Sequence, residues 1–110
     1  MITLAKNVNS DVLEFINSKN ITAVSLNENF GKNVWLIESR ENGRLNGILT
    51  YSFMYSTWTR YNPFISLCLG ENQRDMVNFL RKNFPDRLIR GCAQNCQDLS
   101  VLVACLRLRA

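Results

Sequence analysis

The sequence contains no histidine, and this absence excludes several common kinds of active site. Histidine is the usual general base near neutral pH and a frequent metal ligand, so no Ser-His-Asp or Cys-His pair can form within these 110 residues. The phosphate-binding loop of nucleotide hydrolases, the dinucleotide-binding fingerprint and metal-binding loop patterns are missing as well. Any enzymatic function must therefore depend on other groups.

Long apolar runs are also missing. A membrane-spanning helix needs about 20 apolar residues, whereas the longest uncharged stretch, Leu45–Thr59, is interrupted by amide and hydroxyl side chains. Lys6 and Asp11 lie where an export signal would need an apolar centre. We therefore expect a soluble cytoplasmic protein with no membrane partner.

The chain has few cysteines, and their spacing does not match a common metal site. Cys92 and Cys96 are four positions apart, while Cys68 and Cys105 lie in apolar runs. Without an export signal the thiols should stay reduced and pack as small apolar groups. No metal is expected, and a four-cysteine zinc site is the alternative.

Positive charge gathers in the second half of the chain. Five basic and five acidic residues precede Thr59, whereas eight basic residues and four acidic ones follow Trp58, so this half carries the whole net charge of +4. The asymmetry suits a polyanionic partner, either nucleic acid or the phosphates of a cofactor. A solvated helix face would give the same count.

The first part of the chain predicts one helix and a turn. Ser10 is a plausible N-cap for a short amphipathic helix over residues 10–19, in which Val12 and Ile16 share one face. Residues 21–26 fit either a strand or a helical turn. Residues 27–31 have turn composition and end in a glycine.

An antiparallel ribbon should follow. Residues 34–38 and 45–58 read as strands, and the Asn42-Gly43 pair between them is a strong hairpin signal. Bulky side chains alternate with small polar ones along the second strand, so one face should pack and the other should be half wet. The bulky set is Leu49, Tyr51, Phe53 and Tyr55.

The rest of the chain predicts alternating strands and helices. In order these are a turn over 59–63, a strand over 64–69, a helix over 73–84 ended by Pro85, a strand over 87–92 and a helix over 98–106. The strands at 64–69 and 87–92 should pair in parallel through a right-handed crossover. This order predicts one α+β domain over residues 1–110, with a mixed, mainly antiparallel sheet flanked by helices.

Two segments and the order of elements resemble the GNAT superfamily of N-acetyltransferases. The segments are the strand–turn–helix unit of residues 64–84, FISLCLGENQRDMVNFLRKNF, and the hairpin ENGRLNGIL at 41–49. The resemblance implies an acetyltransferase-like fold and an acyl-CoA-dependent N-acyltransferase, or a relative that has lost activity. In the family, a Gly-rich turn holds the coenzyme A pyrophosphate. The corresponding residues 73–78 contain no glycine, so the side chains of Met76 and Asn78 should obstruct close backbone approach.

The resemblance also implies a set of site residues. It places Ser66, Leu67, Cys68 and Leu69 beside the pantetheine arm of acetyl-CoA, and Gln73, Arg74 and Asp75 near its pyrophosphate. Glu38, Tyr51 and Tyr55 are the candidates for the catalytic base and acid. The acyl acceptor would be an amine, on either a small molecule or a protein.

Two further functions stay open at this point. A non-catalytic protein-interaction module is favoured by the missing glycines and histidine. A stacking platform for single-stranded nucleic acid is the weaker alternative; it would use Tyr51, Phe53, Tyr55, Trp58 and Tyr61, near Arg60. We also expect a homodimer, because little sequence is left for a last hairpin and a sheet edge would then be unprotected.

Overall fold

A computed structural model describes residues 1–19, 26–56 and 59–91; within these, the side chains of 27, 28, 54–56 and 59–61 are not described. The described elements are, in order, β1 (Ile2–Leu4), α1 (Ser10–Ser18), α2 (Leu26–Asn29), β2 (Trp35–Glu41), β3 (Arg44–Ser56), β4 (Thr59–Gly70), α3 (Gln73–Asn83) and β5 (Arg90–Gly91). The fold is α+β, as the sequence predicts. No helix in the described ranges is long and apolar enough to span a membrane.

The five strands form one mixed sheet in sequence order, from β1 at one edge to β5 at the other. The first four are antiparallel, and β5 pairs in parallel with β4, which confirms the predicted pairing. Asn42 and Gly43 both have positive φ, so the Asn-Gly hairpin between β2 and β3 is confirmed too.

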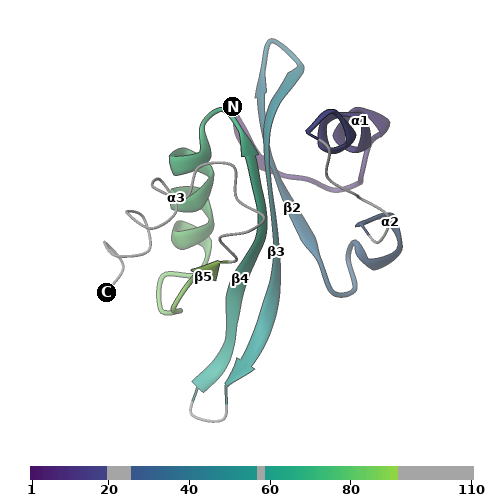
Figure 1. Ribbon diagram of the computed structural model, residues 1–110. Coiled ribbons are helices and arrows are strands. Elements are labelled where there is room, and N and C mark those ends of the chain that lie inside the picture. Colours follow the sequence, from purple (N-terminus) through teal and green to yellow (C-terminus); the bar gives the residue numbers. More distant parts are fainter. Residues whose placement is uncertain (20–25, 57–58, 92–110) are drawn as a thin grey trace.

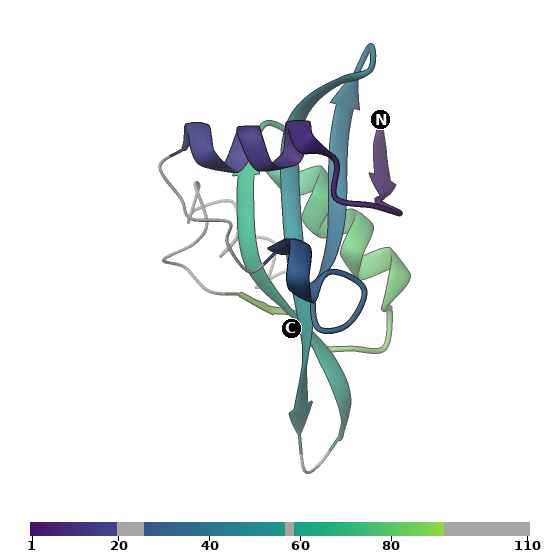
Figure 2. The ribbon, with the colours of Figure 1, turned by 90° about the vertical axis from the view of Figure 1, so that its right-hand side faces the viewer.

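Helices cover both faces of the sheet (Figure 1): α3 packs on one face, and α1 and α2 lie on the other. Turning the molecule by 90° shows α1 crossing in front of the strands while α3 lies behind them (Figure 2). The helix predicted over 73–84 is confirmed, with Met76, Val77 and Leu80 fully buried at helical spacing.

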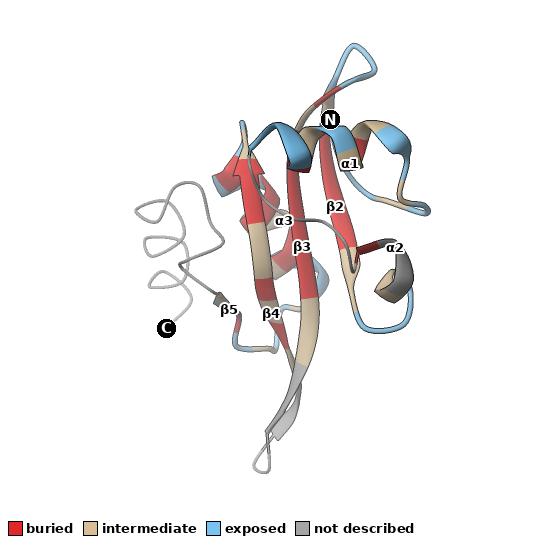
Figure 3. Ribbon diagram, turned by 45° about the vertical axis from the view of Figure 1, so that its right-hand side comes forward, coloured by how far each residue is buried: buried red, intermediate tan, exposed pale blue. Residues whose placement is uncertain are grey.

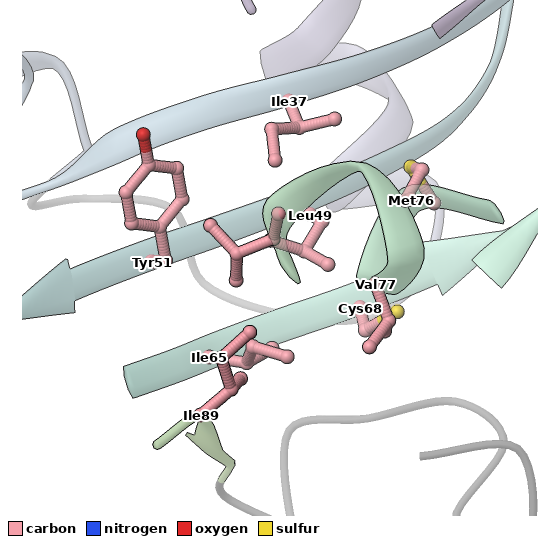
Figure 4. Packing of buried hydrophobic residues seen from close by; sticks show 9 residues of the cluster. Ile37, Leu49, Tyr51, Ile65, Cys68, Met76, Val77 and Ile89 are labelled. Atoms are coloured by element: carbon pink, nitrogen blue, oxygen red, sulfur yellow. The ribbon is translucent and has the colours of Figure 1, made fainter. Parts of the chain in front are cut away.

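Two apolar cores result from this arrangement, and the buried residues run along the central strands (Figure 3). The core under α3 is formed by Ile37, Leu49, Tyr51, Ile65, Cys68, Met76, Val77, Leu80 and Ile89, and all of these except Leu80 are labelled in Figure 4. The core under α1 is formed by Val12, Ile16, Leu26, Leu36, Leu45, Ile48 and Leu69. The alternation along β3 is confirmed, since Leu49 and Tyr51 enter the α3 core and Ile48 enters the α1 core. The prediction that the second face would be half wet is wrong at Ile48 and Thr50, which are buried because helices cover this face as well.

Several boundaries differ from the sequence prediction. Strand β1 was not predicted, because three residues are too few to show a period. Residues 59–63, predicted as a turn, open β4, where Pro63 pairs with Phe53. Asn9 rather than Ser10 is the N-cap of α1. Residues 26–29, which overlap the predicted turn, form the short helix α2.

Two predictions at the end of the chain fall partly or wholly outside the described residues. The last strand is described only at Arg90 and Gly91, within the predicted 87–92. The helix predicted over 98–106 lies outside the described ranges, as do Cys92, Cys96 and Cys105. Cys68 is buried in the α3 core.

Candidate functional site

The β4 strand carries a bulge at Ser66, directly after two residues that pair with β5. Thr50 pairs with Leu67 and Tyr51 pairs with Ile65, so Ser66 is an extra residue on the β4 side. The described pairing with β5 covers only Phe64 and Ile65. Bulges redirect the backbone and are common beside active sites. The predicted pantetheine residues 66–69 therefore begin where β4 changes direction.

The side chains of residues 66–69 pack within the protein and do not line a common surface for a ligand. Leu67 and Leu69 belong to the α1 side of the sheet, and Cys68 is buried in the α3 core. The Ser66 hydroxyl is hydrogen-bonded to the Thr50 hydroxyl at 2.7 Å. A ligand running along this segment would consequently contact the backbone more than the side chains.

The turn from β4 into α3 is short and has an unusual backbone. Gly70 has φ +85° and Asn72 has φ +61°, and the helix begins at Gln73. The Asn72 side chain does not cap the helix; its Nδ2 donates to Ser39 Oγ at 2.9 Å. The first N–H groups of a helix lack intrahelical partners and lie at its positive end, which favours an anion there.

The three predicted pyrophosphate residues behave differently from one another. Gln73 is buried; its Nε2 donates to the Gly70 carbonyl at 2.8 Å, and its Oε1 has no hydrogen-bond partner among the described residues. Arg74 and Asp75 are exposed. Met76 is fully buried in the α3 core, so the obstruction expected from its side chain is absent.

Glu38, a predicted catalytic residue, is held in a network of ion pairs. It is buried in the middle of β2, and Arg40 Nη2 donates to its Oε2 at 2.9 Å. The same guanidinium contacts Asp11 of α1 through both terminal nitrogens, at 2.7 and 3.2 Å. The hydrogen bond from Arg40 lowers the pKa of Asp11, and the two carboxylates raise the pKa of Arg40.

Tyr51, the second predicted catalytic residue, belongs to an aromatic cluster on the α3 side. Its ring centroid lies 6.1 Å from that of Trp35, 5.7 Å from that of Phe53 and 6.0 Å from that of Phe84. Only 4% of Tyr51 is exposed, and burial raises the pKa of its phenol. The same packing covers Tyr51 and Phe53, two of the rings considered for nucleic-acid stacking.

Glu38 and Tyr51 therefore do not converge on one reacting atom. Glu38 lies between Leu36 and Arg40 on the side that α1 covers, whereas Tyr51 packs in the core under α3. The third candidate, Tyr55, lies in β3, and its side chain is outside the described residues. Arg40 and Asp11 were not predicted. The sequence signal that could have identified Arg40 is its charge, two positions after Glu38 in the same strand. Asp11 is distant in the sequence and becomes a partner of Arg40 only through folding.

Among the described residues, two surface hollows lie away from Glu38 and Tyr51. One, of about 640 Å³, lies among α1, the β2–β3 hairpin and the turn before α3, and is lined in part by Phe15, Asn46 and Glu71. The other, of about 670 Å³, lies between Ile2 and the exposed side of α3. Within the described ranges, no cluster of three or more His, Cys, Asp or Glu residues has the arrangement of a metal site.

Comparison with known proteins identifies the fold. No family model and no curated protein sequence matches the chain. A ribosomal-protein-alanine N-acetyltransferase from Brucella melitensis superimposes with a TM-score of 0.65 at 11% identity, over 84% of this chain and 80% of that one. The protein has an acetyltransferase fold.

Two further solved structures share this acetyltransferase fold. An aminoglycoside antibiotic 6'-N-acetyltransferase from Acinetobacter haemolyticus gives a TM-score of 0.58 at 13% identity, over 100% of this chain and 89% of that one. An acetyltransferase from Vibrio fischeri gives 0.52 at 11% identity, over 83% and 95% respectively. At these identities the likeness establishes the fold, and the activity has to be argued from the site.

Proposed function

We propose that this protein binds an acyl-CoA along β4 and transfers the acyl group to an amine. The observation that carries the proposal is the bulge at Ser66 in β4. The named activities of the structural neighbours, all acetyltransferases, support the same reading. The residues that would hold the cofactor are 66–69 and 73–75.

The pantetheine arm would lie along the backbone of residues 66–69. Because the side chains of this segment pack on the two faces of the sheet, backbone amide and carbonyl groups are the natural partners for the two amides of pantetheine. The pyrophosphate would lie at the start of α3, where the helix dipole favours negative charge and exposed Arg74 adds a cation.

The transfer step needs a neutral amine. Its lone pair attacks the thioester carbonyl, a C–N bond forms, the C–S bond breaks, and one proton from the amine leaves while coenzyme A departs as the thiol. Glu38 is paired with Arg40, and Tyr51 lies on the opposite side of the sheet. We therefore propose that Glu38 and Tyr51 do not act as a pair to transfer this proton. Tyr55 remains the candidate for the catalytic acid that protonates the departing thiolate.

A protein that binds partners without catalysis is the second candidate. It is favoured by the ion pair at Glu38, because the carboxylate that would serve as the catalytic base is already engaged by Arg40. This candidate differs from the first in a single observable, the turnover of acetyl-CoA.

Calorimetric titration with acetyl-CoA tests the proposal, with adenosine 3',5'-bisphosphate as the control for simple phosphate attraction. We expect saturable binding that requires the pantetheine arm. Arg74→Ala should weaken it about 5–10-fold, as for the loss of one charge-assisted phosphate contact. Lys32→Ala, which removes an exposed cation from the turn before β2, should leave it unchanged.

Three outcomes separate the candidates. Binding with release of free coenzyme A in the presence of an amine panel supports the acyltransferase. Binding without release in any amine supports the non-catalytic protein. Failure to bind acetyl-CoA at millimolar concentration overturns the cofactor site itself.

A further inference from the structure

The β1 strand forms one edge of the sheet and, apart from its short length of three residues, lacks the features that usually protect an edge. It is the outermost strand, and among the described residues it pairs with β2 alone. Residues 1–5 contain no charged side chain and no proline, and the β1–β2 register has no bulge. Natural edges commonly carry such features because an open edge can pair with another strand. Figure 2 shows β1 at this edge.

Hydrogen bonding to β2 shows which backbone groups of β1 point outward. Arg40 N donates to Met1 O, and Ala5 N donates to Leu36 O. Since antiparallel residues alternate, the odd positions face β2 and the backbone groups of Ile2 and Leu4 face away from it. The side chains of the edge are exposed as well, with Met1 at 88% and Leu4 at 50%.

On the surface of α3 next to this edge, the charge changes sign along the helix. Asp75, Asn78, Phe79 and Lys82 lie at helical spacing on one stripe, and all four line the hollow of about 670 Å³ beside Ile2. Asp75 and Lys82 are exposed at the two ends of the stripe, and the ring of Phe79 is half-buried between them. The stripe is thus acidic toward the start of α3 and basic toward its end.

We propose that β1 is a docking edge for a second copy of this chain. The two β1 strands would pair antiparallel about a two-fold axis through Thr3, so that Ile2 of one copy exchanges backbone hydrogen bonds with Leu4 of the other. Each sheet would then continue into its partner. The exposed Leu4 side chain would be covered by the partner's Ile2, on the side of the sheet that α3 occupies.

Self-complementarity favours a second copy over an unrelated strand. The two-fold axis that pairs the strands also makes the two α3 helices antiparallel. The acidic end of one stripe, at Asp75, then points toward the basic end of the other, where Arg81 and Lys82 both line the hollow, so the two charge patterns are complementary. A foreign strand would satisfy the backbone but would leave this charge arrangement without its match.

Sedimentation velocity over a concentration series from micromolar to millimolar tests the proposal. We expect a reversible monomer–dimer equilibrium. Leu4→Lys should weaken dimerisation about tenfold or more, because each dimer loses two apolar contacts and gains two like charges. Leu88→Lys is the matched control, since Leu88 is similarly exposed, at 46%, and lies away from the edge; it should leave the equilibrium within about twofold.

A backbone variant separates edge pairing from simple apolar contact. Leu4→Pro removes the outward N–H of β1 while the hydrogen bonds of Met1 and Ala5 to β2 stay in place. It should abolish the dimer and leave the circular dichroism spectrum unchanged. If Leu4→Pro does not fold, Leu4→Lys still decides, because its side chain is exposed and needs no backbone change.

The register has its own test. Thr3 pairs with its symmetry mate at the axis, so Thr3→Cys should give a disulfide-linked dimer on mild oxidation, well above the amount formed by the unaltered chain with its native thiols. A strict monomer at millimolar concentration overturns the proposal. So does a dimer that Leu4→Lys and Leu88→Lys weaken equally, because its interface would then lie elsewhere. None of these readouts depends on acyl-CoA binding.

Discussion

Gly47 of β3 lies directly opposite Gly70 of β4, and neither position has room for a side chain. A Cβ at Gly47 would lie 2.3 Å from the Glu71 carbonyl oxygen, and one at Gly70 would lie 2.3 Å from the Asn46 carbonyl oxygen. The Glu71 N–H in turn donates to Asn46 O at 2.8 Å. The two glycines therefore let the turn before α3 lie directly on β3.

Gly47→Ala should destabilise the protein by about 1–3 kcal/mol, because the added methyl group forces the turn at Glu71 to move. Urea denaturation measures the change in the free energy of unfolding. Gly43→Ala is the control: its added Cβ would meet open space, so it should cost only about 1 kcal/mol for the positive φ. Equal losses in the two variants would argue against the close packing at Gly47.

Arg40→Met should destabilise the protein by about 2–4 kcal/mol, since it leaves the buried carboxylate of Glu38 without its partner. Asp11→Asn, which removes the more exposed partner of the same guanidinium, should cost less than about 1 kcal/mol. Chemical denaturation of both variants at neutral pH checks the order. A larger loss for Asp11→Asn would mean that the exposed pair dominates the network.

The Asp11–Arg40 pair also predicts a dependence of stability on pH. Hydrogen bonding from Arg40 lowers the pKa of Asp11 in the folded state below its ordinary value of 3.8. This contribution is therefore fully present above the ordinary pKa and is lost as the pH falls through the lower folded-state value. Thermal unfolding scans from neutral to strongly acidic pH should show a steeper loss for the unaltered chain than for Asp11→Asn.

Tyr51 should act as a packing residue rather than as a proton donor. Tyr51→Phe keeps the ring contacts with Trp35 and Phe84 and should change the free energy of unfolding by less than about 1 kcal/mol, whereas Tyr51→Ala should cost about 3–5 kcal/mol. If an acyltransferase activity is found, Tyr51→Phe should retain it. Loss of activity in a stable Tyr51→Phe protein would restore the catalytic role.

The phenol of Tyr51 gives this prediction a second readout. Burial raises its pKa above the ordinary value of 10.0, so the unfolded state releases this proton first as the pH rises. Stability should therefore fall above about pH 10. Ultraviolet titration of the tyrosines should show a late-titrating group that is missing from Tyr51→Phe.

Local patterns in the sequence were sufficient for most of the described elements. The Asn42-Gly43 turn, the alternation around Tyr51 and the apolar spacing of Met76, Val77 and Leu80 each depend on residues close in the chain, and each is confirmed. The α+β class follows from the order of those elements. Local patterns failed where pairing overrides propensity, as at Pro63 within β4 and in the three-residue strand β1.

The site depended on tertiary structure. The sequence alone identified the strand–turn–helix unit of residues 64–84 and the carboxylate and phenol groups available for chemistry. Only folding decided that Glu38 pairs with Arg40 and Asp11 on one side of the sheet while Tyr51 packs on the other, and that β4 bulges at Ser66. The physical reason is that a strand's period selects a face, whereas the partners that cover each face come from distant segments of the chain.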